Sequence, residues 1–279
     1  MAKILITGAS DGLGRALAHD LAGAGHRLIL HGRDPTRLAE VAERTGGESV
    51  RADLSSLAEV RALAGTVRER HDRLDVLVNN AGVGFGPPGG GRELSKDGYE
   101  LRFAVNYLAP YLLTRLLLPL LRRSAPARVV NVASAGQAPV DLDDLMMERG
   151  YHGVEAYRQA KLALIADTFT LAGELDPAEV TVNCLHPASL MPTTMVREAR
   201  TGTIDPLERG LRATRRLVDD PALAGLTGRY YDGIRERRAL AQAYDPEFRQ
   251  RLRERTEALI HRAGQPGTRG EPAPPATSD

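Results

Sequence analysis

"KILITGASDGLG", residues 3–14, is the stretch that decides the fold. A short apolar run ends at Gly8, a turn through Gly12 follows, and a helical pattern begins near Gly14. Glycines allow a tight turn and a close approach to the backbone, and the N–H groups at the start of a helix favour a pyrophosphate. The glycine spacing differs from that of the commonest dinucleotide fingerprint, and glycine-rich turns also occur for structural reasons alone. The stretch predicts a strand, a turn and a helix, with a dinucleotide site at the turn as one interpretation.

More short apolar runs follow along the chain, and amphipathic segments separate them. Such an alternation predicts a parallel sheet covered by helices on both faces, the doubly wound α/β or Rossmann fold. The expected strands are residues 3–8, 27–32, 49–54, 74–80, 127–134 and 180–187. The expected helices are residues 14–24, 36–45, 56–71, 95–122 and 153–175.

The length of 279 residues and the 42% hydrophobic content predict a single domain, residues 1–263, with a sizeable core. Residues 188–220 interrupt the alternation, and we expect them to form a small substrate lid. The segment "TGRYYDG", 227–233, is expected to add an edge strand. Residues 264–279 are rich in Pro, Gly and small polar residues without apolar periodicity, which predicts a disordered tail.

The composition excludes several classes of function. The net charge is +1 with both signs interleaved, which is atypical of a nucleic-acid-binding protein. Cys184 is the only cysteine, so an intramolecular disulfide is excluded; no metal-ligand spacing is present, and a reducing cytoplasm fits. The chain begins with a strand pattern, and its most apolar stretch, 101–121, is interrupted by Arg102 and other polar residues. We therefore expect a soluble cytoplasmic protein that binds no nucleic acid, no membrane and no metal.

The segment "AYRQAK", 156–161, places a phenol beside an ammonium. Tyr157 and Lys161 are four residues apart, so their side chains meet on one face of a helix. Only three of the 37 basic residues are lysines, which makes a lysine here unusual for this chain. A Tyr four residues before a Lys also arises by chance, so the pair gains meaning only together with other motifs.

The second expected strand ends in "HGRD", residues 31–34. Gly32 stands where an acidic residue would bind the ribose 2′-hydroxyl of NAD, and the following Arg33 can bind the 2′-phosphate of NADP. The alternatives are a solvated surface arginine at position 33, and an Asp34 that serves NAD. We expect NADP(H) as the cofactor and regard NAD(H) as the less favoured choice.

Four motifs together resemble the short-chain dehydrogenase/reductase family: "TGASDGLG" at 7–14, "NNAG" at 79–82, "VNVAS" at 130–134 and "AYRQAK". The resemblance covers about residues 3–235, and it is closest to the retinol-dehydrogenase-like and bacterial ketoreductase members. It implies that residues 135–156 form an added loop near the substrate. It also implies a homodimer or homotetramer that associates through the helices at 95–122 and 153–175.

The resemblance implies a catalytic set of Asn106, Ser134, Tyr157 and Lys161. Reduction of a carbonyl leaves an alkoxide that must take up a proton, so an acid and a hydrogen-bond donor must reach the same oxygen. Tyr157 would be the acid and Ser134 the donor, while Lys161 would bind the nicotinamide ribose and stabilise tyrosinate. Pro110 follows Asn106 by four residues and has no N–H, which predicts a helix kink and a free Asn106 carbonyl that would hold a relay water; a simple helix break is the alternative.

The cofactor site implied by the resemblance extends over the glycine-rich turn and the ends of the following strands. Asp53 could accept from the adenine amino group or cap the next helix. After the sixth strand, Ala188 and Pro192 depart from the residues usual in the family, which leaves open whether Thr193 or Thr194 binds the nicotinamide carboxamide. The expected cofactor-binding residues are Gly8, Ser10, Asp11, Gly12, Leu13, Gly14, Arg33, Asp53, Leu54, Asn80, Ala81, Gly82, Tyr157, Lys161, Pro187 and Thr193.

The predicted function is an NADP(H)-dependent oxidoreductase. It would transfer a hydride between the nicotinamide and a small, fairly apolar ketone or aldehyde, or the corresponding alcohol, held between residues 135–156 and 188–220. A non-catalytic NADP-binding regulator on the same fold is the alternative, although such proteins typically lack the Tyr and the Lys.

Overall fold

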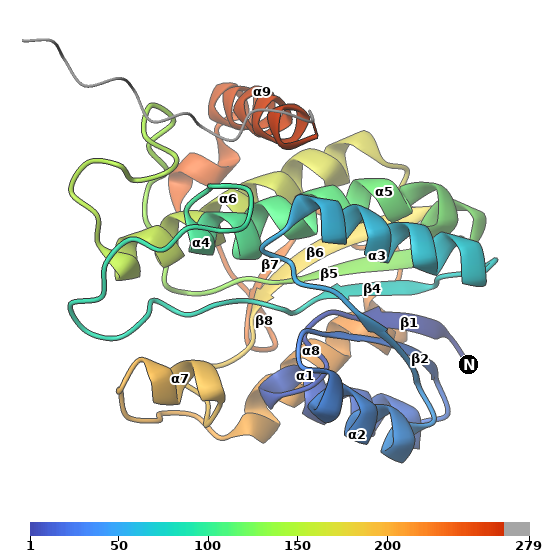
Figure 1. The fold of residues 1–279 in the computed structure, drawn as a ribbon. Helices are drawn as coiled ribbons and strands as arrows, with labels where there is room; N and C mark the ends of the chain where they lie inside the picture. The colour runs from blue at the N-terminus through green and yellow to red at the C-terminus, as the bar shows by residue number, and fades with distance from the viewer. Residues whose placement is uncertain (265–279) are drawn as a thin grey trace, which may run out of the picture.

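An eight-stranded sheet forms the centre of this computed structural model, which describes residues 1–264 (Figure 1). The strand order is β3-β2-β1-β4-β5-β6-β7-β8; the first seven strands are parallel, and β8 is antiparallel to β7. The expected tail, 264–279, lies outside the described residues except for Gly264. The strands are β1 (Lys3–Ile6), β2 (Arg27–Gly32), β3 (Glu48–Arg51), β4 (Val76–Asn79), β5 (Ala127–Val132), β6 (Val180–His186), β7 (Tyr230–Asp232) and β8 (Arg235–Glu236).

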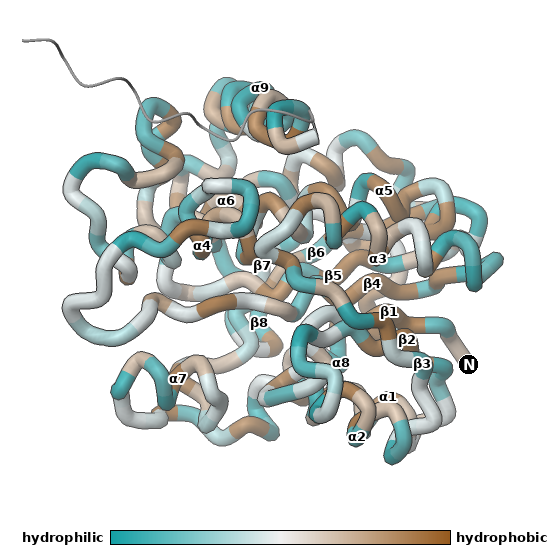
Figure 2. The backbone as a smooth tube through the Cα atoms, viewed as in Figure 1, coloured by the Kyte–Doolittle hydropathy of each residue, from teal (hydrophilic) through white to brown (hydrophobic). Residues whose placement is uncertain are grey.

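Helices cover both faces of the sheet, as the doubly wound prediction required (Figure 1). Hydrophobic residues are frequent along the strands and recur in the helices around them (Figure 2), and the buried ones form one cluster on each face of the sheet. One face carries α3 (Leu57–Arg70), α4 (Leu101–Phe103), α5 (Ala109–Arg123), α6 (Gly153–Glu174) and α9 (Pro246–Ala263). The other face carries α1 (Gly12–Gly23), α2 (Pro35–Thr45) and α8 (Leu207–Asp219).

The remaining helical segments are short. They are α7 (Thr194–Glu198), the 3-10 turns Pro221–Leu223 and Ala241–Tyr244, and a π-helical turn, Ala104–Leu108, between α4 and α5. Pro110 lies just after this π-helical turn and has no N–H to donate; the missing donor fits the wider hydrogen bonding there, such as Ala109 N–H to Ala104 O. The chain runs in opposite directions away from β1 and β4, so a crevice opens at the carboxyl ends of these strands, where ligands bind in such sheets.

The boundary of the expected lid at 188–220 is wrong at its C-terminal end. Residues 207–219 form α8, which packs on α1 and buries Ala213 and Leu217 in the sheet core. The amphipathic pattern of α8 restores the strand–helix alternation, and only 188–206 remains over the crevice. The expected edge strand is also corrected, because β7 pairs with β6 on one side and with the short β8 on the other.

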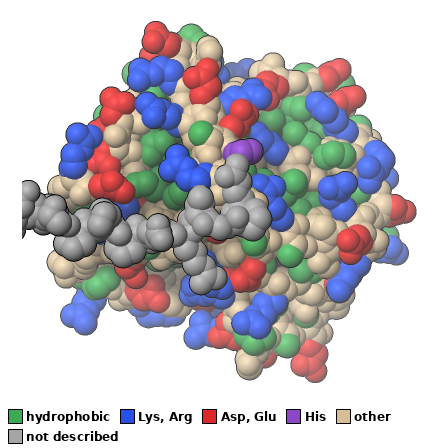
Figure 3. Space-filling model, turned by 45° about the horizontal axis from the view of Figure 1, so that its top comes forward, with side chains coloured by type: hydrophobic (Ala, Val, Ile, Leu, Met, Phe, Trp, Pro, Cys, Tyr) green, Lys and Arg blue, Asp and Glu red, His purple; other side chains and the backbone are tan. Residues whose placement is uncertain are grey.

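Helix α9 lies against α6 and α3 (Figure 1). The hydroxyl groups of Tyr107 and Thr256 are hydrogen-bonded at 2.8 Å, and Phe248 and Leu252 are buried. This helix therefore covers part of the surface that the family resemblance implied as a subunit interface. The side of the molecule turned forward in Figure 3, toward α9, carries acidic and basic side chains interspersed with apolar ones.

One helical stretch in residues 1–264, Leu101–Arg123, is long and apolar enough to span a membrane. Of its most apolar 18-residue window, 78% is buried inside the protein. This burial is what the core helix of a globular domain requires, since α5 packs against α3 and β5.

Candidate active site

The glycine-rich turn between β1 and α1 leaves no room for side chains at its glycine positions. Gly8 and Gly12 have φ angles of +67° and +51°, in the left-handed region that favours glycine. A Cβ on Gly14 would lie 2.2 Å from the Gly8 carbonyl oxygen. The turn therefore brings bare backbone N–H groups to the start of α1, where an anion is favoured.

Side chains from two other strands hold this turn in place. The Asn80 amide donates to the carbonyl oxygens of Thr7 and Gly8 at 2.8 and 3.2 Å. His31 at the end of β2 accepts from the Gly8 N–H at 3.3 Å through Nδ1, and its Nε2 lies 3.1 Å from the Ala52 carbonyl oxygen. Burial lowers the pKa of His31 to about 4, so the ring is neutral at pH 7 and can accept at Nδ1 while donating at Nε2.

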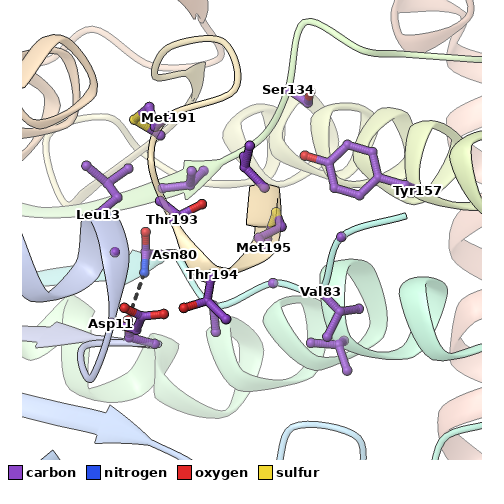
Figure 4. A pocket seen from close by; sticks show the side chains of 18 of the residues that line it. Asp11, Leu13, Asn80, Val83, Ser134, Tyr157, Met191, Thr193, Thr194 and Met195 are labelled. Carbon is purple, nitrogen blue, oxygen red and sulfur yellow. Dashed lines mark hydrogen bonds between the residues drawn. The ribbon is translucent and has the colours of Figure 1, made fainter. Parts of the chain in front are cut away.

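A cavity of about 1030 Å³ extends from this turn along the carboxyl ends of the strands to Tyr157 (Figure 4). Every site residue expected from the sequence lines it, except Gly14 and Asn106. Gly14 packs behind the turn, as described above. Asn106 is fully buried; its amide oxygen accepts from the Val83 N–H at 2.8 Å, and its amide nitrogen donates to the Val83 carbonyl at 3.0 Å. Both residues thus shape the wall of the cavity from behind.

At one end of the cavity, Arg33 and Arg37 both reach the wall. Asp34 accepts from the N–H groups of Thr36 and Arg37 at 3.0 and 3.1 Å and so caps α2. One oxygen of the carboxylate considered as an NAD ligand therefore caps α2. Arg37 was missed in the sequence because a single arginine in an arginine-rich helix carries no distinguishing signal.

Asp53 lies beside these arginines in the same cavity. Its carboxylate accepts from the Ser55 N–H at 3.0 Å and pairs with Lys96 at 3.2 Å. Burial alone would raise the pKa of Asp53. The bonds from Ser55 and Lys96 lower this pKa by more than burial raises it, so the net shift is downward and the group stays charged. Capping of the next helix is the wrong alternative for Asp53, because Ser56 caps α3.

The expected catalytic side chains converge at the other end of the cavity. Ser134 follows β5, while Tyr157 and Lys161 project from one face of α6, and the Tyr157 hydroxyl points into the cavity toward Ser134 (Figure 4). The Lys161 ammonium donates to the Val132 carbonyl at 2.8 Å and lies 5.7 Å from the centre of the Tyr157 ring. A Cβ on Gly82 would lie 3.6 Å from Lys161 Nζ and 3.0 Å from Asn106 Oδ1, so this glycine leaves space beside the ammonium.

Burial controls the protonation of this group. It raises the pKa of Tyr157, although a hydrogen bond with Ser134 acts in the opposite direction. It lowers the pKa of Lys161 to about 8, because the ammonium is only 3% exposed. At pH 7 the phenol is therefore protonated, and the lysine is still charged.

Helix α7 crosses over the middle of the cavity. The Thr194 hydroxyl bonds the Asp11 carboxylate and accepts from Arg197 at 2.8 Å. The methyl group of Thr193 would be 3.0 Å from a Cβ on Gly12. The lid therefore contacts the glycine-rich turn directly, and Thr194 already has partners for its hydroxyl.

The comparisons agree with this fold and identify the family. The model of the short chain dehydrogenase family matches residues 2–203, and the chain therefore belongs to this family. Retinol dehydrogenase 13 of Homo sapiens is 33% identical over 296 residues, which cover 97% of this chain and 88% of that protein. This similarity places the chain in the retinol-dehydrogenase-like branch.

Two solved structures with bound nicotinamide cofactors are also similar. RhlG of Pseudomonas aeruginosa, in an NADP active-site complex, superposes with a TM-score of 0.68 and 31% identity over 83% of this chain and 94% of that one. The 3-ketoacyl-(acyl-carrier-protein) reductase of Brucella melitensis, complexed with NADH, has a TM-score of 0.68 and 27% identity over 83% of this chain and 96% of that one. One structure holds NADP and the other NADH.

Proposed function

We propose that this chain is an NADP(H)-dependent oxidoreductase that interconverts a ketone or aldehyde and the corresponding alcohol, with Tyr157 as the acid and base. The observation that carries the proposal is that one cavity joins the glycine-rich turn to Ser134, Tyr157 and Lys161. A regulator that only binds a dinucleotide requires no proton donor. A protonated phenol and a buried ammonium at the far end of the site therefore favour an enzyme.

The residues of this chain fit a nicotinamide dinucleotide. The glycine-rich turn, where a Cβ would collide with backbone, offers N–H groups to a pyrophosphate, and Arg33 and Arg37 offer charge to a 2′-phosphate. Thr193 supports the carboxamide better than Thr194 does, because the Thr194 hydroxyl is engaged by Asp11 and Arg197. When bound, such a cofactor supplies or accepts the hydride.

In the direction of reduction, the Tyr157 phenol donates its proton to the oxygen that was the carbonyl oxygen. The Ser134 hydroxyl donates a hydrogen bond to the same oxygen, which stabilises the charge that develops there. Lys161 stays protonated below about pH 8 and stabilises the tyrosinate that remains. Because burial keeps Tyr157 protonated at neutral pH, this arrangement favours reduction over oxidation under those conditions.

The substrate that fits is fairly apolar. The cavity wall on the Tyr157 side carries apolar side chains, including Phe85, Val154 and Met195. The similarity to a retinol dehydrogenase supports an apolar substrate of this kind. The burial of Leu101–Arg123 supports a soluble protein, which we place in the cytoplasm.

A substrate panel tests the proposal. Purified protein is incubated with NADPH and apolar aldehydes and ketones, retinal among them, and NADPH oxidation is followed by absorbance. We expect turnover with some members of the panel. Tight NADPH binding without turnover of any carbonyl, in either direction, would instead support the regulator.

Arg33→Ala tests the cofactor preference. Since a charge-assisted phosphate contact contributes about 1.5 to 3 kcal/mol, NADPH should bind the native protein about ten- to a hundredfold more tightly than NADH. Arg33→Ala should remove most of this preference by weakening NADPH binding alone. Dissociation constants from NADPH and NADH fluorescence titrations provide the measurement.

The matched control is Arg44→Ala, which changes an arginine in the last turn of α2 that does not line the cavity. It should leave both dissociation constants unchanged. Equal affinities for the two cofactors in the native protein would remove the basis for NADP.

Lys161→Arg tests the geometry of the buried ammonium. A planar guanidinium directs its donors in a fixed fork and cannot reproduce the geometry of the compact ammonium that donates to the Val132 carbonyl at 2.8 Å, so we expect turnover to fall by at least about tenfold. In the native protein, reduction should slow above about pH 8 as Lys161 loses its proton. In the variant this decline should move to higher pH, because an arginine remains charged. Rate profiles from pH 6 to about 9 measure both effects, and native kinetics throughout would show that the lysine is incidental.

A further inference from the structure

A buried arginine lies directly behind the substrate end of the cavity. Arg102 is only 3% exposed, and all three guanidinium nitrogens have partners. Nε donates to the Gly84 carbonyl at 3.1 Å, Nη1 to the Glu100 carboxylate at 3.4 Å and Nη2 to the Glu93 carboxylate at 2.6 Å. Burying a guanidinium is unfavourable unless each of its donors has an acceptor. Because the Gly84 carbonyl is one of the acceptors of Arg102, this network holds Gly84 in position.

The same network reaches the added loop at 135–156. Glu100 is 1% exposed; besides Arg102, it accepts from the Phe103 N–H at 2.7 Å and from the Tyr151 hydroxyl at 3.3 Å. Tyr151 lies at the end of that loop, just before α6 begins. The Arg102–Glu100 pair therefore connects two segments that border the substrate end of the cavity.

The residue after Gly84 contacts the proposed acid. The rings of Phe85 and Tyr157 meet edge to face, with centroids 5.7 Å apart and an angle of 88° between the ring planes. A Cβ on Gly153 would lie 2.3 Å from the Phe85 carbonyl oxygen, so the backbone of Phe85 rests directly on the first turn of α6. Because Gly153 is one helical turn before Tyr157, Phe85 contacts the catalytic helix at two successive turns.

We propose that Arg102 is a positioning residue: it fixes Gly84 so that the ring of Phe85 holds the Tyr157 ring in its reactive orientation and forms the aromatic wall of the substrate site. This inference rests on the proposed function, since it requires Tyr157 to be the proton donor. Arg102 itself touches neither the cavity nor any reacting atom, and acts through the backbone of residues 84 and 85.

A second, partly buried arginine supplies a matched control. Arg115 donates to the Asp167 carboxylate at 3.1 and 2.7 Å and stacks over the Tyr111 ring at 3.3 Å. This pair joins α5 to α6 but does not line the cavity. Arg102→Lys and Arg115→Lys both keep a positive charge and lose the fork of a guanidinium, so both should lower the melting temperature.

The kinetic outcomes separate positioning from stability. Arg102→Lys should lower kcat by about three- to tenfold, which is the change in rate expected when the energy of one edge-to-face aromatic contact is lost from the transition state. The variant should leave the NADPH dissociation constant unchanged. Arg115→Lys should leave kcat unchanged. Hydrogen–deuterium exchange needs no substrate: residues 82–93 should exchange faster in Arg102→Lys and at the native rate in Arg115→Lys.

Phe85→Leu keeps an apolar side chain and removes only the ring, so it tests the same step in a variant expected to fold. Its kcat should fall by a similar factor. The double variant Arg102→Lys/Phe85→Leu should be no slower than the slower single variant, because both changes interrupt one chain of contacts.

Additive losses in the double variant, or equal effects of Arg102→Lys and Arg115→Lys on kcat and exchange, would overturn the inference. If these outcomes occur while Tyr157→Phe is inactive, the proposed function stands and only the role of Arg102 is wrong. If Tyr157→Phe retains native turnover, the proposed function fails and the inference fails with it.

Discussion

Tyr157→Phe is expected to lower kcat for carbonyl reduction by about 10²- to 10⁴-fold, the usual contribution of a positioned general acid. The substitution removes one hydroxyl group and keeps the ring that packs edge to face on Phe85. The fold and the NADPH dissociation constant should therefore change little. Steady-state kinetics and a fluorescence titration on the same preparation measure the two quantities.

Ser134→Ala serves as the graded comparison for Tyr157→Phe. Ser134 accepts from the Gly136 N–H at 3.0 Å, and its hydroxyl lowers the pKa of Tyr157 against the effect of burial, so its loss removes a hydrogen-bond donor but leaves the proton donor in place. Turnover in Ser134→Ala should fall, but less than in Tyr157→Phe. If Tyr157→Phe turns over as fast as the native protein, another group supplies the proton, and the assignment of this site is wrong.

Gly14→Ala is expected to abolish measurable NADPH binding. The new Cβ would lie 2.2 Å from the Gly8 carbonyl oxygen and 2.5 Å from the Asn80 amide nitrogen, and neither can withdraw without opening the glycine-rich turn. Overpacking of this kind typically destabilises a fold by about 1 to 3 kcal/mol, so the variant should also unfold at lower denaturant concentration. NADPH fluorescence titration and urea unfolding provide the two measurements.

Gly23→Ala is the matched control, because Gly23 ends the same helix and a Cβ there would meet nothing within 4 Å. Alanine favours helix over glycine, so this variant should bind NADPH normally and be as stable as the native protein or slightly more so. Native NADPH affinity in Gly14→Ala would show that the turn tolerates rearrangement and is not the cofactor cradle.

Features encoded by local spacing could be predicted from the sequence. The glycines of residues 7–14 specify a turn that only glycine can form, and Tyr157 and Lys161 meet because four residues make about one helical turn. Residues of both signals line one cavity in the structure.

The contacts around Phe85 could not be predicted in this way. They depend on a segment, residues 80–93, without helix or strand, whose path is set by long-range bonds from Asn106 and Arg102. No periodicity in the sequence indicates which carbonyl an arginine will bind. In the sequence, Arg102 therefore counted only as a polar interruption of an apolar stretch.

The C-terminal helices were missed for a different reason. In α9, the buried positions Phe248, Leu252 and Thr256 form a narrow stripe at a spacing of four residues within a strongly charged segment. So few apolar residues give a weak amphipathic signal, although they are enough to cover Tyr107. In α8 the amphipathic pattern was present, but the preceding irregular segment obscured the start of the helix.

Helix α9 also shows that the folded unit extends well beyond the family-model match. The family match stops at residue 203, yet the Tyr107 hydroxyl in the core is hydrogen-bonded to Thr256, and the Tyr99 hydroxyl donates to the Leu259 carbonyl at 2.7 Å. A chain trimmed at the family boundary would lose α8, β7, β8 and α9, and would leave Tyr99 and Tyr107 without the partners of their hydroxyl groups. The smallest piece of this protein that can be expected to fold stably therefore extends through residue 263, sixty residues beyond the end of the family-model match.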